Sequence, residues 1–330
     1  MRVNFSEMGR LYEKLAKKSM SLLRKDLKEA GYWYSSAADC YRMEGDEEKF
    51  RRLKKLALKC FSDFLKDKEK KRVMDAGQVY LWISHIYHSF GDANKFHRFA
   101  VRAAEAFSLA ARRMAESDKT ALQAIIGYYN SANCYRLIGD EKNAERGYRK
   151  ALSIYRQKGA HKGVEFSPVL QASCYYRIGE HKRAIEILER ELESRVLSPL
   201  VYSNIRLILG CYYLESTNKK MAKKHFEEAK ILPDTEKLSA PELVTQALCQ
   251  MMLGNRKNAV GLAELSMKLS TKIRDYNLGQ LIQETSGIIM HLAKGQHSVV
   301  EGVMASLTWQ HPDLPLYDAL SIITRHQTGK

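Results

Sequence analysis

Small, aromatic and glycine positions recur along this chain at a regular spacing. In the clearest copy, Ala132 is followed by Tyr135 and then by Gly139. Residues three apart share one face of a helix, so the spacing predicts a helix whose apolar side packs on a neighbour. After the glycine, Ala144 and Tyr148 continue the apolar pattern. The pattern therefore predicts a second helix, joined to the first by a tight turn.

The same helix–turn–helix unit returns several times, with threonine replacing the turn glycine in one copy. We call the turn residues the turn anchors, and they lie 37 to 48 residues apart: Gly45, Gly91, Gly139, Gly179, Thr217, Gly254 and Gly295. Each spacing has room for two helices of about four turns and two short loops. Glycine ends the first helix in the left-handed conformation, and a following Asp or Asn caps the second. Such units bury their apolar faces only by stacking, which predicts an all-α solenoid.

The copy around Gly139 resembles the tetratricopeptide repeat. The matching residues are Tyr128, Ala132, Tyr135, Gly139, Asp140, Ala144, Tyr148 and Ala151. Two other copies depart from the family, with Phe50 and Phe96 where it prefers a small residue. The resemblance covers roughly residues 30 to 300 and implies a right-handed superhelical α-solenoid of about seven repeats. We expect an N-terminal helix or cap at 1–30, the repeat array at 31–300, and a C-terminal helical cap and tail at 301–330.

Long irregular units that end in a helical cap also resemble the soluble NSF attachment proteins (SNAPs). The tail from Leu281 through Gly295 and Val300 to Leu320 is similar to their C-terminal bundle. Two features differ from those adaptors: this chain is more basic, and its end, residues 324–330, replaces their acidic, leucine-ended tail.

Positive charge is concentrated toward the N-terminal end. The chain has a net charge of +16 and a pI of about 9.4, and residues 1–115 hold 25 Lys and Arg against 15 Asp and Glu. A group that we call the basic stripe falls on one predicted helix: Arg51, Arg52, Lys54, Lys55 and Lys59. Such a stripe either is a solvated face or attracts an acidic helical bundle, an anionic membrane surface or nucleic acid.

The resemblance implies that the first helix of each pair lines a concave groove. The small and aromatic positions are used in packing, so we expect the residues after them to point inward. The predicted partner-binding residues are Arg42, His85, His88, Tyr129, Asn133, Arg136, Tyr176 and Arg177. Asn and Arg side chains can hydrogen-bond a peptide backbone or a carboxylate. The lysine-containing carboxylate clamp of the family's chaperone-binding members is not matched, because Tyr129 stands where the lysine would be.

Cysteine usage and motif searches argue against metal binding and catalysis. Four of the 6 cysteines lie five residues before a turn anchor, without C-x-x-C or ligand-spaced Cys/His clusters, which predicts small packing residues in a reducing compartment. Phosphate-binding loops, nucleophile elbows and HExxH motifs are absent. An apolar run of about 20 residues and an apolar signal core are also absent, which predicts a cytoplasmic protein.

The sequence therefore predicts a non-enzymatic adaptor or scaffold without a cofactor or metal. Its partner is expected to be an acidic protein or peptide, bound on the concave or the basic face. Two alternatives remain open: a basic repeat protein associated with RNA or DNA, and a regulatory repeat protein that responds to a peptide.

Overall fold

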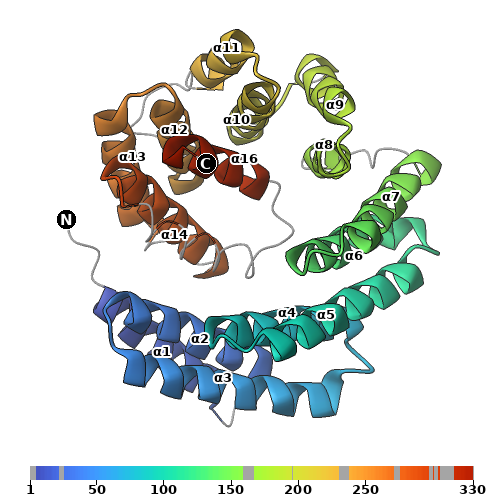
Figure 1. The fold of residues 1–330 in the computed structure, drawn as a ribbon, viewed down its shortest axis with the longest axis vertical. Coiled ribbons are helices and arrows are strands. Elements are labelled where there is room, and N and C mark those ends of the chain that lie inside the picture. Colours follow the sequence, from blue (N-terminus) through green and yellow to red (C-terminus); the bar gives the residue numbers. More distant parts are fainter. Residues whose placement is uncertain are drawn as a thin grey trace. The chain divides into compact units, whose positions relative to one another are not determined.

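The computed structural model describes residues 5–21, 26–158, 167–194, 196–229, 238–270, 276–296, 300, 304 and 316–329, and all its regular elements there are helical. In chain order, the elements up to residue 158 are α1 (Phe5–Ser19), α2 (Leu27–Met43), α3 (Glu47–Lys68), α4 (Val73–Ser89), α5 (Ala93–Met114), the 3-10 helix η1 (Asp118–Thr120), α6 (Ala121–Leu137) and α7 (Glu141–Lys158). The later ones are α8 (Ser167–Arg177), α9 (His181–Ser194), α10 (Pro199–Glu215), α11 (Lys219–Ala229), α12 (Ala240–Met252), α13 (Arg256–Ser270), α14 (Tyr276–Ala293) and α16 (Leu316–Thr328). The prediction of an all-α solenoid of helix–turn–helix repeats is confirmed (Figure 1).

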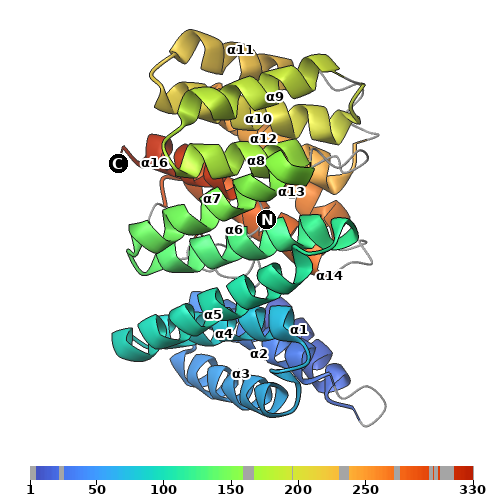
Figure 2. The same cartoon turned by 90° about the vertical axis from the view of Figure 1, so that its right-hand side faces the viewer.

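The chain divides into two compact units, residues 1–150 and 151–330. In the first unit, α2 pairs with α3 and α4 with α5, while α1 packs on α2 and α6 on α5 (Figure 2). In the second unit, the pairs are α8 with α9, α10 with α11 and α12 with α13, while α14 packs on α13 and α16 on α10. The expected cap and array boundaries stay a prediction. Helix α2 runs through residue 30, and the expected C-terminal cap lies outside the described residues before α16, apart from residue 304.

All seven turn anchors have the backbone conformation that their positions require. Their φ angles are positive, from 63° at Thr217 to 83° at Gly45. In each turn, the backbone N–H after the anchor donates to the carbonyl five residues earlier at 2.9 Å, as in Asp140 to Tyr135. This is the Schellman arrangement, which satisfies carbonyls left open at the end of a helix. The turn placement predicted from sequence is confirmed.

Acidic and amide side chains after the anchors begin the second helices. The backbone N–H of Lys49, Lys95 and Asn143 donates to Asp46, Asp92 and Asp140 at 3.0, 3.0 and 3.1 Å. Asn218 accepts the same bond from Met221 at 3.1 Å. A side-chain cap of this kind contributes about 1 kcal/mol. The capping prediction therefore holds for α3, α5, α7 and α11.

Close approach between paired helices explains the small residues. Ala38, Ala132, Ala172 and Ala247 are completely buried. Three glycines go further, because a Cβ atom there would overlap an aromatic ring of the paired helix: Gly31 faces Phe61, Gly77 faces Phe107, and Gly210 faces Phe226. The hairpins therefore pack through a small residue on one helix and a ring on the other, at the density of protein interiors.

Two turn substitutions should change stability in opposite directions. Thr217 is a β-branched residue at positive φ, where an L-residue costs roughly 1–2 kcal/mol. Thr217→Gly removes that cost and loses about 0.5–1 kcal/mol of chain entropy, so we expect a small rise in the free energy of unfolding. Gly139→Val should lower it by about 1 kcal/mol or more, because φ is 77° there. Urea unfolding of both variants measures the two signs, and a destabilised Thr217→Gly protein would contradict the account.

Candidate functional site

Because the turns fix the register, residues at the same distance from their anchors occupy equivalent places on successive first helices. Arg42, His88 and Arg136 each lie three residues before an anchor, on α2, α4 and α6. Arg42 and His88 are exposed, and Arg136 is half-buried. We call these three residues the cationic row. All three were predicted as partner-binding residues, and the structure brings them to one repeat position of the first unit.

Two phenylalanines support this row. The Arg42 guanidinium carbon lies 5.0 Å from the ring centroid of Phe50, and the His88 ring meets the ring of Phe96 edge-on at 5.2 Å. Both phenylalanines lie five residues after an anchor, where the third repeat has Ala144. These are the positions that depart from the tetratricopeptide pattern. The contact of the Arg42 guanidinium with an aromatic ring contributes about 0.5–1 kcal/mol at an exposed site.

A second set of polar residues lies six positions before the anchors, and two of its members bond to their own second helix. Lys54 donates from Nζ to Asp39 and to Ser35 Oγ, both at 2.8 Å. Tyr148 donates from Oη to Asn133 Oδ1 at 2.5 Å. Lys54 and Tyr148 both lie nine residues after their anchors. The same pair of repeat positions thus joins the first helix to the second in two repeats.

The assignment of Lys54 to the basic stripe is wrong. Its side chain is completely buried, as are Ala100, Leu188 and Ala263 at the equivalent position of other repeats. The aliphatic stem crosses the core, and Ser35 and Asp39 satisfy the ammonium group. Burial lowers the pKa of Lys54, and the charge of Asp39 opposes that shift.

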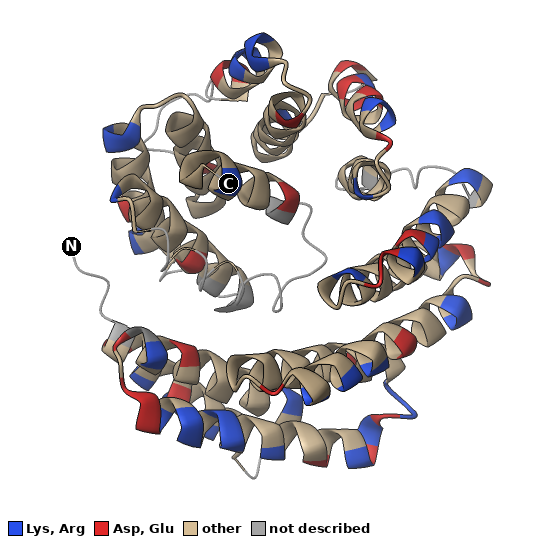
Figure 3. Cartoon of the chain, in the orientation of Figure 1, with Lys and Arg blue, Asp and Glu red and all other residues tan. Residues whose placement is uncertain are grey.

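The other four residues of the basic stripe, Arg51, Arg52, Lys55 and Lys59, are exposed on α3. Figure 3 shows the corresponding blue segments along this helix. Arg51 pairs with Glu47 at 2.8 Å, and Arg52 lies 3.9 Å from Glu13. Leu56 lies among them and is 39% exposed. The stripe therefore combines positive charge with one exposed apolar side chain.

Three predicted groove residues are buried rather than presented to solvent: His85, Tyr129 and Asn133, at 7%, 1% and 5% exposure. Tyr129 packs its ring 5.6 Å from that of Tyr148. Burial and then the charges of Lys54, His88 and Arg42 hold the pKa of His85 well below its usual range. His85 is therefore neutral at pH 7, and its surroundings carry excess positive charge. Within the described residues, no carboxylate pairs with Arg42 or Arg136.

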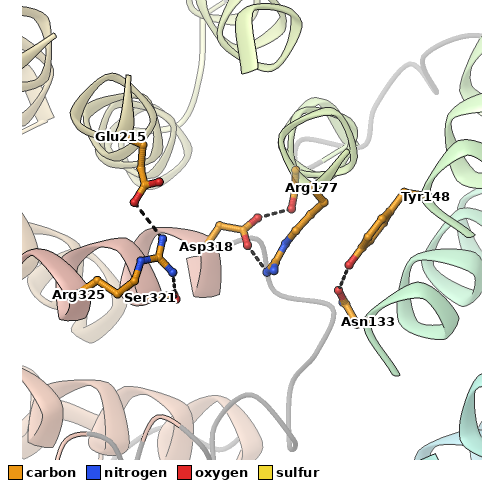
Figure 4. A network of polar contacts seen from close by, with 8 residues as sticks. Asn133, Tyr148, Arg177, Glu215, Asp318, Ser321 and Arg325 are labelled. Atoms are coloured by element: carbon orange, nitrogen blue, oxygen red, sulfur yellow. Dashed lines mark hydrogen bonds and ion pairs between the residues drawn. The ribbon is translucent and has the colours of Figure 1, made fainter. Parts of the chain in front are cut away.

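The remaining two predicted residues lie in the second unit and already have intramolecular contacts. Tyr176 stacks on Tyr212 with ring centroids 4.2 Å apart and an interplanar angle of 3°. Arg177 forms an ion pair with Asp318 of α16, which also accepts a hydrogen bond from Ser173 (Figure 4). Asp318 was missed from the sequence because a single acidic residue in a non-repeating tail gives no pattern.

Other chemistry finds no support among the residues that the structure describes. They contain no group of three or more His, Cys, Asp or Glu side chains that could hold a metal ion. The six cysteines are free and buried, as their packing role predicts. Of the helices described, none is long and apolar enough to cross a membrane.

The fold and the rows define a repeat protein built from helical hairpins. Residues 127–158 match the tetratricopeptide repeat family model, so this chain contains a tetratricopeptide repeat at the position where the sequence pattern is clearest. A search of curated proteins finds no match.

Similar solved structures include three helical proteins. BtubC (BKLC) from P. vanneervenii is 21% identical, with 69% of this chain and 91% of that chain covered and a TM-score of 0.43. The apo quorum sensor NprR from B. thuringiensis is 13% identical, with 99% and 97% covered and a TM-score of 0.37. A circular tandem repeat protein with novel repeat topology is 11% identical, with 98% and 86% covered and a TM-score of 0.32. Likenesses this remote say nothing about what this chain binds.

Removal of Asp39 should lower the free energy of unfolding more than removal of its buried partner Lys54. Asp39→Ala leaves the ammonium of Lys54 completely buried without its counter-charge, so we expect a loss of about 3 kcal/mol or more. Lys54→Met should cost less, because Asp39 keeps 24% exposure and can be hydrated. Chemical denaturation of both variants measures the difference, and Lys49→Met on the exposed face is the control. A larger loss for Lys54→Met would contradict this assignment.

Stability should fall in mild acid because of two buried histidines. The pKa of His85 lies well below 6.5, and burial followed by Arg206 and Lys224 lowers that of His225 to about 4. Below pH 6.5 the unfolded chain binds more protons at these residues than the folded chain, so the unfolding free energy decreases as pH falls toward 4. Denaturation midpoints at pH 7.5 and 5.0 should differ less for the double variant His85→Gln/His225→Gln than for the parent. Equal differences would exclude the two histidines as the cause.

Proposed function

We propose that this chain is a non-enzymatic protein-interaction repeat protein whose cationic row binds acidic side chains of a partner. The observation that carries this proposal is the repeat position that Arg42, His88 and Arg136 share on three successive first helices. Folds of tetratricopeptide type are generally interaction scaffolds, and residues 127–158 match that repeat. The partner is a peptide or helix that presents carboxylates at a matching spacing.

Arginine suits this role because its planar guanidinium donates two parallel hydrogen bonds to a carboxylate. Phe50 and Phe96 restrict the side chains of Arg42 and His88 before any partner arrives. Restricting them in advance lowers the entropic cost of binding.

The exposed stripe residues on α3 have a different role in this proposal. Arg51, Arg52, Lys55 and Lys59 carry charge that attracts an acidic partner during its approach. Exposed rim charges of this kind mainly change the association rate and its salt dependence. Leu56, at 39% exposure, gives the stripe one apolar contact. We therefore assign steering to the stripe and carboxylate binding to the cationic row.

Several finer predictions rest on sequence alone. The likeness to SNAPs, a cytoplasmic location and the two alternative functions stay predictions. Nucleic acid would also be attracted by positive charge, and the logarithm of its binding constant would then fall steeply and linearly with the logarithm of salt concentration. Capture of a membrane-trafficking ATPase or a coiled-coil bundle would support the SNAP-like relationship.

Charge reversal in the row should abolish partner capture. We would compare the parent, Arg42→Glu/Arg136→Glu, and the control Lys142→Glu/Arg146→Glu, which changes net charge equally on exposed positions of α7. Each protein is immobilised and incubated with nuclease-treated and untreated halves of a lysate of the native cell at two salt concentrations, and captured proteins are quantified by mass spectrometry. We expect the row variant to lose at least about 90% of one discrete captured protein, because each reversal replaces attraction by repulsion. The control should retain it.

Two outcomes would contradict the proposal. Equal loss in both double variants would mean that net charge, and not the row, attracts the partner. Loss of every captured protein upon nuclease treatment alone would assign the positive surface to nucleic acid. A third variant, Lys55→Glu/Lys59→Glu, separates steering from binding, because it should slow association of the captured protein without changing its dissociation rate.

A further inference from the structure

The last described helix, α16, contacts the first helices of two consecutive repeats at equivalent positions. On α8 its contacts are Ser173 and Arg177, which lie six and two residues before the anchor Gly179. On α10 its contacts are Cys211 and Glu215, which lie six and two residues before Thr217. The two residues on each helix are one turn apart. Helix α16 is thus seated against equivalent positions of two successive first helices.

Opposite charges fix how α16 is seated. Asp318 is 2% exposed and bonds to Ser173 and Arg177, while Arg325 donates to Glu215 at 2.9 Å (Figure 4). The acid and the base of α16 are seven residues apart, which places them on one face of the helix. Between them, the apolar side chains of α16 are buried at 0–2% exposure: Ala319, Leu320, Ile322 and Ile323. The face of α8 and α10 therefore accepts an amphipathic helix with one acid and one base two turns apart.

Helix α16 differs from the second helices of the repeats. Six second helices begin two residues after their anchor, whereas α16 begins 21 residues after Gly295. The repeats pair through small residues against rings, as Gly210 does with Phe226. The attachment of α16 instead combines buried apolar side chains with two ion pairs that another amphipathic helix could supply. A charge pair of low exposure selects its partner strongly, since loss of either member leaves the other without compensation.

We propose that the face of α8 and α10 is a helix-binding groove that α16 occupies as an intramolecular ligand. An external partner helix with the same acid and base would compete with α16 for this groove. The chain's own tail therefore keeps the second unit closed until such a helix displaces it. This inference concerns residues separate from the cationic row and does not depend on its function.

The probe for this proposal is a fluorescein-labelled peptide of residues 316–329, which carries the α16 sequence. Fluorescence anisotropy measures its binding to three full-length proteins: the parent, the Asp318→Ala variant and the control variant Asp63→Ala. The control removes an acid of α3 whose side chain is 41% exposed. We expect Asp318→Ala to bind the peptide at least about ten-fold more tightly than the parent, because its own α16 no longer competes equally. The control should match the parent. A peptide that itself carries Asp318→Ala should bind the Asp318→Ala protein at least about ten-fold more weakly than the peptide of the parent sequence does.

A second variant, at an exposed ion pair, tests the proposal even if Asp318→Ala does not fold. The pair of Arg325 and Glu215 is exposed, at 48% and 36%, so Arg325→Glu should leave the fold intact while it loosens α16. The double variant Arg325→Glu/Glu215→Arg restores opposite charges and should return peptide binding by the parent sequence to low affinity. Helix content and melting temperature confirm folding of each protein. If folded Asp318→Ala and Arg325→Glu bind the peptide no better than the parent, α16 is a permanent cap and the proposal is overturned.

Discussion

Everything in this fold depends on the turn residue that holds a positive φ between paired helices. The turn fixes where the second helix begins, two residues after the anchor in six hairpins. A fixed start gives each residue a place that depends only on its distance from the anchor. Thr217 shows how strong this constraint is, because a β-branched residue adopts a φ of 63° there despite a cost of roughly 1–2 kcal/mol. Surrounding contacts of the repeat, and not local preference, set that angle.

Given this register, the properties of the first unit follow from a few departures from the repeat pattern. Phe50 and Phe96 replace small residues and hold Arg42 and His88. Lys54 replaces an apolar residue and bonds to Asp39. A buried ion pair seldom adds net stability, since desolvation offsets most of the attraction. Its effect here is electrostatic: Asp39 pairs with Lys54 within the hairpin, and among the residues described no carboxylate forms an ion pair with Arg42.

The parts predictable from sequence are those that depend on neighbours within a few residues. The turn anchors, the caps such as Asp140 and the small packing positions are of this kind. Burial of the polar first-helix residues was harder to predict, because it depends on a second-helix side chain 15 residues later, as for Asn133 with Tyr148. Comparison with the other repeats would have predicted that Lys54 is buried, since the residues nine positions after the other anchors are apolar or aromatic. The contact of Asp318 with Ser173 spans 145 residues of sequence and follows from no local pattern.

One repeat position differs between hairpins in whether it can bond to the first helix. Nine residues after the anchor, two hairpins of the first unit have Lys54 and Tyr148, which bond to the polar residues six before the anchor, whereas the hairpin between them has Ala100. At the same position the second unit has Leu188 and Phe226, which offer no hydrogen bond. The hydroxyl of Ser173 is completely buried and donates to Asp318 of α16, which lies outside its own hairpin. Breaking a buried hydrogen bond of this kind costs about 1–3 kcal/mol. A helix that replaces α16 without an acceptor at this point would forfeit that contribution.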